Sequence, residues 1–226
     1  MSAEKSLSVK IFALIVGVIL LGCMQTKTPN PQVSTAPTKS GTQIPTDQPA
    51  PIPKTVLAYP IDNFTTGVTK KPFGIYITPA TSPVQPERFT GYHTGADIET
   101  SAAQKDTGVW VHAIADGKVE LNRWVSGYGG VIIISFNFNG KTYSALYGHL
   151  NTPANLKVGD RITAKQTLTT LGAGYSHATD GERKHLHFSL RPGVDLDLRG
   201  YVQNKSELSS WIDPVGFFGE FASYLN

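Results

Sequence analysis

The strongest constraint on the fold is a hairpin signal in the middle of the chain. The dipeptide Asn139-Gly140 separates an apolar run, 131–136, from a second strand-like run, 141–147. Asn-Gly is a preferred two-residue turn between antiparallel strands, because both residues tolerate a positive φ. The segment therefore predicts two antiparallel strands joined by a tight turn.

Short strand-like runs separated by turn residues surround this hairpin. They lie at 109–113, 117–121, 167–171 and 185–190. The 22 glycines and 15 prolines favour turns over long helices. The C-terminal stretch 208–225 has spaced aromatic residues, but Pro214 and Gly219 keep any helix there short. The pattern predicts an all-β fold, mainly of antiparallel sheet, with a short C-terminal helical segment.

The N-terminal part has the pattern of a targeting segment. Lys5 and Lys10 precede a short apolar run that ends in Leu20-Leu21-Gly22-Cys23. A basic region, a short apolar region and a small residue are typical of a secretory signal, and the run is short for a transmembrane helix of about 20 residues. The end of the run resembles the bacterial lipobox, which implies that Cys23 is lipidated and becomes the new N-terminus. An uncleaved signal anchor is the alternative.

The next segment has little capacity to fold. Residues 24–55 consist mainly of Pro, Thr, Ser, Gln and Lys, and such a segment buries too little apolar surface to offset its ordering entropy. We therefore expect a signal peptide at 1–22, a lipid-anchored disordered linker at 23–58 and a folded domain at 59–226. The expected location is the cell envelope, outside the cytoplasm, with the lipid on Cys23 in a membrane. The pattern leaves inner and outer membrane open.

Charge and cysteine content exclude two classes. The net charge of +3 arises within the first 58 residues, so the expected domain has no excess of positive charge and nucleic-acid binding is not predicted. The single cysteine excludes an internal disulfide framework. The oligomeric state is not indicated.

Histidines and one aspartate are the candidate site residues. In Lys184-His185-Leu186-His187-Phe188 the alternation indicates a strand, so His185 and His187 share one face. His93, Asp97 and His149 lie upstream. Three protein ligands with an open fourth position make a hydrolytic zinc site, and neighbouring imidazoles can transfer protons. From the residues alone, His93 and Asp97 could bind a metal together with either His185 or His187. The alternative is that His185 and His187 are half-exposed strand residues without a functional role.

These stretches resemble the lysostaphin/LytM-type zinc metallopeptidases, which are peptidoglycan endopeptidases. The resemblance covers 91–191 and rests on His93-Thr94-Gly95-Ala96-Asp97-Ile98, Val111 to Val119, Gly127 to Ile132, Tyr147-Gly148-His149-Leu150 and His185-Leu186-His187-Phe188. It implies a LytM/lysostaphin-like β domain of the duplicated-hybrid-motif type.

The resemblance also implies the roles of the five residues. One Zn²⁺ is expected on His93, Asp97 and His187, with His149 and His185 as the catalytic pair. The implied function is a zinc-dependent endopeptidase that hydrolyses peptide bonds in peptidoglycan stems or cross-bridges. The alternative is a non-hydrolytic lipoprotein that binds wall peptides or regulates a cell-wall amidase.

Some features depart from the family or stay open. Arg183 and Lys184 stand where the family usually has a small residue or Pro, so we expect a changed groove wall. Residues 60–90 are long enough to cross the groove, and Asn63 could reach a metal, although a plain β lead-in is preferred. His112 is expected to be a surface or packing residue, His177 to lie on a solvated loop and not to be a ligand, and Tyr92 and Tyr147 to be packing residues.

Overall fold

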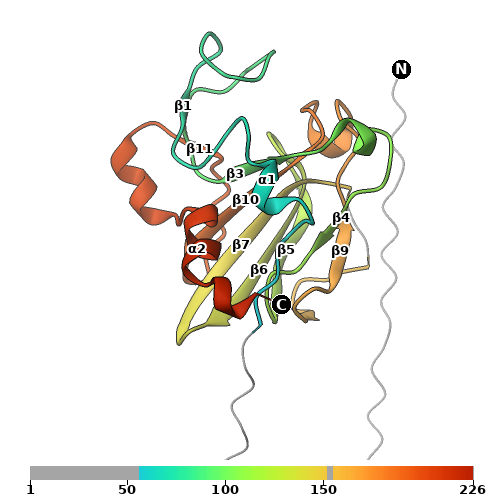
Figure 1. Ribbon diagram of the computed structural model, residues 1–226, viewed down its shortest axis with the longest axis vertical. Helices are drawn as coiled ribbons and strands as arrows, with labels where there is room; N and C mark the ends of the chain where they lie inside the picture. The colour runs from blue at the N-terminus through green and yellow to red at the C-terminus, as the bar shows by residue number, and fades with distance from the viewer. Residues whose placement is uncertain (1–55, 152–154, 226) are drawn as a thin grey trace, which may run out of the picture. The chain divides into compact units, whose positions relative to one another are not determined.

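A computed structural model of the chain describes residues 56–151 and 155–225 (Figure 1). Every pairing between its named strands is antiparallel. The predicted fold class, mainly antiparallel sheet with few short helices, is therefore confirmed. The expected signal peptide at 1–22, Cys23 and most of the expected linker lie outside the described residues.

The strands form three sheets. The largest has the order β3-β10-β7-β6-β5-β8, with bounds Ala96–Glu99, His185–Pro192, Lys141–Leu150, Gly129–Phe138, Gly117–Val125 and Arg161–Ile162. A three-stranded sheet has the order β1-β2-β11, with bounds Tyr76–Ile77, Gly91–His93 and Tyr201–Val202. The third sheet pairs β4 (Trp110–His112) with β9 (Thr167–Thr170).

The helices are short. The α-helices are α1 (Phe64–Gly67) and α2 (Pro214–Glu220), and the 3₁₀ turns are η1 (Ala102–Gln104), η2 (His177–Thr179), η3 (Lys205–Ser210) and η4 (Ala222–Tyr224). Asp213 caps the N-terminus of α2: its side chain accepts from Val215 N, and Pro214 is the first residue of the helix. This is the expected C-terminal helical segment. Within the described ranges, no helix combines the length and apolar character needed to cross a membrane.

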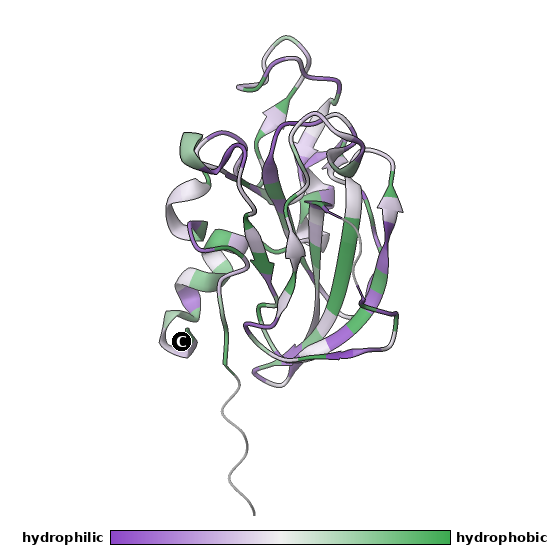
Figure 2. Cartoon of the chain, turned by 90° about the vertical axis from the view of Figure 1, so that its right-hand side faces the viewer, coloured by the Kyte–Doolittle hydropathy of each residue, from purple (hydrophilic) through white to green (hydrophobic). Residues whose placement is uncertain are grey.

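The predicted hairpin forms the centre of the large sheet. β6 and β7 are joined at Asn139 and Gly140, whose φ angles are 49° and 72°. β6 is buried on both faces: Val131 and Ile133 belong to one apolar cluster, and Ile132 and Ile134 to a larger one. This double burial explains why the strand is an uninterrupted apolar run. Figure 2 shows hydrophobic residues concentrated along the strands of the large sheet.

The C-terminal segment closes the larger cluster. Phe217 and Phe218 of α2 are buried against the sheet, where Phe218 lies 4.8 Å from Phe64 between ring centroids. Leu57 is fully buried, and its N–H donates to the Tyr224 carbonyl oxygen at 2.9 Å. The two ends of the described region therefore pack together beside the sheet.

Candidate active site

Strand register brings distant residues together. In the pairing of β10 with β3, His187 lies opposite Asp97, and in the pairing of β10 with β7 it lies opposite Gly148, next to His149. His93 is the last residue of β2. Residues from four strands thus meet at one end of the large sheet.

Three ligand atoms form a nearly equilateral triangle. His93 Nε2 lies 3.0 Å from His187 Nδ1 and 3.2 Å from Asp97 Oδ1, and the last two atoms are 3.1 Å apart. All three side chains are buried. They form a group that could hold a metal ion.

The triangle fits zinc in size and in chemistry. Two imidazole nitrogens and one carboxylate oxygen are a ligand set that zinc uses in hydrolytic sites. Ligand distances of about 2.0–2.1 Å in a tetrahedral site place the ligand atoms roughly 3.3 Å apart, close to the observed sides. The predicted clustering of His93, Asp97 and His187 is therefore confirmed.

Each of these side chains has a second partner that orients it. His93 Nδ1 lies 3.3 Å from the Pro72 carbonyl oxygen, and His187 Nε2 lies 3.5 Å from the Tyr128 hydroxyl. Asp97 Oδ2 accepts from Arg183 Nη2 at 3.0 Å. Such outer contacts determine which ring nitrogen would be available to a metal ion, Nε2 of His93 and Nδ1 of His187. Sequence alone does not show this.

Burial and neighbouring charges shift the pKa values of Asp97 and His187. Burial alone would raise the pKa of Asp97, but the charges of His185 and His93 outweigh it and hold this pKa well below its usual range. Burial lowers the pKa of His187 to about 4. The carboxylate is therefore ionised and His187 is neutral, which are the forms that bind metal.

His149 and His185 lie beside the triangle. Their ring centroids are 4.3 Å apart. His149 Nδ1 lies 3.3 Å from the Thr179 carbonyl oxygen, and His185 Nδ1 lies 2.9 Å from that of Arg183. Burial first, and then the charge of His185, hold the pKa of His149 well below its ordinary value, so this imidazole is neutral. The structure thus brings all five predicted residues together.

Two motif glycines have a steric reason. A Cβ on Gly95 would lie 2.6 Å from the Phe188 carbonyl oxygen and 2.8 Å from His187 Nε2. A Cβ on Gly148 would lie 2.6 Å from Cδ1 of Tyr128. Only glycine lets the strands approach closely enough to bring the histidines together.

His149 has an unusual backbone conformation. Its φ is 62°, in the left-handed region that is uncommon for residues other than glycine. It lies near the end of β7, where its carbonyl oxygen accepts from Gly172 N at 2.9 Å. Strained backbone of this kind is concentrated at functional sites.

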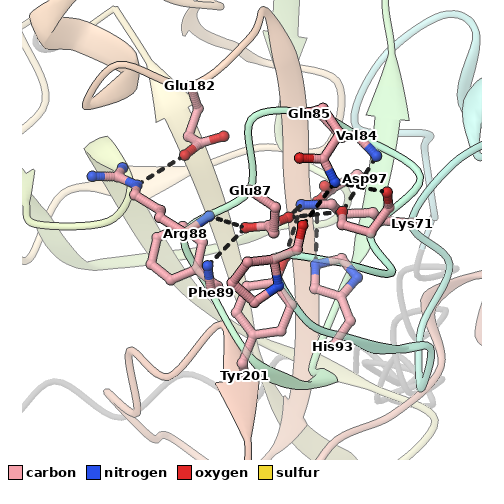
Figure 3. A network of polar contacts seen from close by, with 12 residues as sticks. Lys71, Val84, Gln85, Glu87, Arg88, Phe89, His93, Asp97, Glu182 and Tyr201 are labelled. Atoms are coloured by element: carbon pink, nitrogen blue, oxygen red, sulfur yellow. Dashed lines mark hydrogen bonds and ion pairs between the residues drawn. The ribbon is translucent and has the colours of Figure 1, made fainter.

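A cavity of about 280 Å³ opens at the triangle and is lined by Asp97, His149, His185 and His187. One wall contains Lys71, which donates to Glu87 and, at 3.2 Å, to the Tyr201 hydroxyl. Figure 3 shows this network next to His93 and Asp97. The Lys71 and Glu87 side chains are only 3% and 1% exposed, so the wall is a fixed part of the site.

An arginine joins two segments at the edge of this cavity. Arg88 Nε donates to Glu182 at 3.0 Å, and its Nη2 donates to the carbonyl oxygen and to Oδ2 of Asp180 at 2.7 and 3.0 Å. Asp180 Oδ2 also accepts from Gly127 N at 2.7 Å.

Asn63 was expected as a possible metal contact. Its side-chain amide instead donates to the Glu99 carbonyl oxygen at 2.7 Å.

The remaining sequence candidates occupy structural positions. His177 stacks on Trp124 with ring centroids 5.1 Å apart, and His112 Nδ1 lies 3.3 Å from the Thr167 hydroxyl. The fully buried Tyr147 accepts from Ile114 N at 3.1 Å, as expected for a packing residue. Lys184 donates to the main-chain carbonyl oxygens of Gln104, Lys105 and Thr107.

The residues of the cavity lining that were not predicted from the sequence include Lys71, Tyr128 and Tyr201. Tyr128 belongs to the quoted Gly127-Tyr128-Gly129-Gly130 turn, which could have drawn attention to it. Lys71 and Tyr201 carry no local signal, because they reach the site only through long-range packing.

Comparison with known proteins identifies one family model that matches part of the chain. The segment 91–198 matches the family model described as Peptidase family M23. Residues 91–198 form an M23 peptidase domain. All five candidate residues lie within the M23 domain, and the three ligand candidates are intact.

Two curated relatives match part of the chain. The Murein hydrolase activator EnvC of Escherichia coli (strain K12) is 36% identical over 84 residues, 37% of this chain and 18% of that protein. An uncharacterized protein of Haemophilus influenzae (strain ATCC 51907 / DSM 11121 / KW20 / Rd) is 32% identical over 97 residues, 42% of this chain and 22% of that protein. The matched segments thus span about a fifth of each relative.

Among solved structures, the catalytic domain of lysostaphin from Staphylococcus simulans is similar at 24% sequence identity and a TM-score of 0.47. The match covers 70% of this chain and 96% of that domain.

Proposed function

We propose that the chain is a zinc-dependent endopeptidase that hydrolyses peptide bonds in the stems or cross-bridges of peptidoglycan. The observation that carries the proposal is the triangle of His93 Nε2, Asp97 Oδ1 and His187 Nδ1, with sides of 3.0–3.2 Å, beside the rings of His149 and His185. The M23 domain supports the substrate class, since this family acts on peptidoglycan.

The metal and the two histidines would have separate roles in hydrolysis. When bound by His93, Asp97 and His187, Zn²⁺ would polarise the scissile carbonyl and lower the pKa of a water in the fourth position. His149 donates through Nδ1 to the Thr179 carbonyl oxygen, which leaves Nε2 free to take the proton of the attacking water and to pass it to the amine that leaves when the C–N bond breaks. His185 would stabilise the carbonyl oxygen as it gains negative charge.

Hydrolysis of purified peptidoglycan tests this function. The zinc-loaded chain is expected to release new amino groups from sacculi, and a chelator is expected to abolish the release. His149→Ala is expected to keep the zinc and lose the activity. A zinc-loaded, folded chain that releases no amino groups contradicts the proposal.

A second candidate function is regulation of another wall enzyme. It is supported by the relative named as a murein hydrolase activator, which matches 37% of this chain. The complete set of five residues favours hydrolysis over this alternative. If the chain and His149→Ala stimulate an added cell-wall amidase equally, while neither releases amino groups alone, regulation is the function.

The proposed location depends on the N-terminal segment. Removal of 1–22 and lipidation of Cys23 would hold the M23 domain on a membrane in the cell envelope, near its substrate. The pattern Leu20-Leu21-Gly22-Cys23 supports this. The mass of the mature N-terminus tests it: a lipid-modified Cys23 is expected, and globomycin should block the processing. An intact Met1 in mature protein contradicts it.

A further inference from the structure

The guanidinium of Arg183 points into the protein. It stands two residues before His185, and its side chain is only 9% exposed. Its Nη2 donates to Asp97 Oδ2 at 3.0 Å, and its Nε lies 3.1 and 3.0 Å from the two carboxylate oxygens of Glu99. The guanidinium thus bridges two carboxylates of β3 instead of facing solvent.

The two oxygens of Asp97 have different surroundings. Oδ1 belongs to the triangle with His93 and His187, whereas Oδ2 accepts from Arg183 and lies 3.2 Å from His185 Nε2. A charge-assisted hydrogen bond from a guanidinium is strong and directional. This hydrogen bond disfavours rotation of the carboxylate to place both oxygens on one metal ion.

The same residue contacts His185 through its main chain. The Arg183 carbonyl oxygen lies 2.9 Å from His185 Nδ1, so that nitrogen carries the proton and donates it. One residue therefore orients a ligand candidate with its side chain and a catalytic candidate with its backbone.

Glu99 keeps the guanidinium in place. It lies opposite His185 in the β3 and β10 pairing, and its carboxylate also lies 3.6 Å from Lys70 Nζ. A buried charge is tolerated only with a well-placed partner. With Glu99 as the second partner, Arg183 stays on Oδ2 without the metal.

We propose that Arg183, anchored by Glu99, is a positioning residue that holds Asp97 as a single-oxygen metal ligand. This inference rests on the proposed function, because it takes Asp97 as a ligand of the zinc ion.

Arg183→Lys tests the inference, because lysine keeps the charge and loses the planar fork. Zinc affinity is measured by competition with a chromophoric chelator, and the ligand geometry by the visible absorption of the Co²⁺-loaded chain. We expect zinc to bind about tenfold more weakly, since changing an outer partner typically costs 10–100-fold in affinity. We also expect weaker Co²⁺ absorption, as a second Asp97 oxygen raises the coordination number.

Two further variants complete the experiment. Glu99→Gln removes the anchor and is expected to weaken zinc binding in the same direction by a smaller factor. Lys118→Gln removes an exposed partner of Glu120 and is expected to change neither readout.

The outcomes separate this inference from the proposed function. Arg183→Lys with a zinc Kd within twofold of the wild type and an unchanged Co²⁺ spectrum overturns the positioning role. If Arg183→Lys does not fold, Glu99→Gln provides the test: an unchanged zinc Kd and an unchanged Co²⁺ spectrum in that variant overturn the positioning role. A wild-type chain that binds no zinc overturns the proposed function itself.

Discussion

His187 Nδ1 lies 3.1 Å from Asp97 Oδ1, and the two residues face each other across the antiparallel pair of β10 and β3. This register joins residues 90 positions apart. Pairing of distant strands therefore brings the candidate metal ligands together. Substitutions in and around this group are expected to differ in their effects on zinc binding and on stability.

Removal of a proposed zinc ligand and removal of a proposed catalytic histidine should have different effects on zinc content. His187→Ala is expected to lose the metal, because one of the three triangle atoms disappears. His149→Ala and His185→Ala should keep it, since neither ring belongs to the triangle. Zinc per chain, measured by atomic absorption after dialysis, checks this. Equal zinc in all three variants would show that the roles are wrongly assigned.

Gly148→Ala should destabilise the fold. The added Cβ would lie 2.6 Å from the Tyr128 ring, and overpacking of this kind costs about 1–3 kcal/mol. The free energy of unfolding in urea measures the effect. Gly219→Ala is the matched control: nothing lies within 4 Å of its added Cβ in α2, so the change should be neutral or stabilising. Equal effects at the two positions would contradict the steric account.

The pair of Lys71 and Glu87 should contribute to stability in acid. Burial alone would raise the pKa of Glu87, but the hydrogen bonds from Lys71 and Phe89 N, with the charge of Lys71, outweigh it and lower this pKa from 4.5. Ionised Glu87 therefore stabilises the fold above about pH 4.5, and this stabilisation is lost as the pH falls through the folded-state pKa.

Glu87→Gln tests this dependence. The unfolding free energy of the variant should fall less steeply between about pH 5 and 3 than that of the wild type. Glu120→Gln removes a carboxylate paired with the exposed Lys118 and should leave the slope close to that of the wild type. If the unfolding free energy of Glu87→Gln depends on pH as steeply as that of the wild type, the pKa of Glu87 is not lowered in the fold.

Arg88→Gln should loosen the edge of the cavity with little loss of global stability. The Arg88 side chain is 47% exposed, and exposed ion pairs contribute at most about 1 kcal/mol. Its contacts with Asp180 and Glu182 nevertheless join two loops. Faster amide hydrogen exchange is expected in both loops.

The exchange experiment has an internal comparison. Arg199→Gln removes an arginine that is 53% exposed and pairs with Asp197 and Glu207, so it should not change exchange in residues 84–90. If Arg88→Gln leaves the exchange of residues 84–90 and 180–182 unchanged, the bridge does not hold them together.

Local patterns predicted the centre of the fold and the shared face of His185 and His187, whereas the set of metal ligands was implied by the resemblance to the zinc metallopeptidases. The Asn139-Gly140 turn and the alternation around His185 and His187 follow from turn chemistry and from the period of a strand, which act over a few residues. β1, β8 and β11 have two residues each, too few for any periodicity. Their pairing depends on tertiary packing.

Arg183 shows the limit of local reasoning. A loop arginine is ordinarily solvated, and its position in the sequence predicted a changed groove wall. Its partners Asp97 and Glu99 lie 86 and 84 positions away, so only the β3 and β10 register shows that the side chain turns inward. His149 is similar: the motif identifies the residue, but its φ of 62° comes from the packed structure.

The most direct test of the account compares zinc-loaded wild type with zinc-loaded His149→Ala on purified peptidoglycan. The account predicts one zinc per chain in both proteins and release of new amino groups by the wild type alone. Release of amino groups at the same rate by both proteins, or by neither, would contradict it.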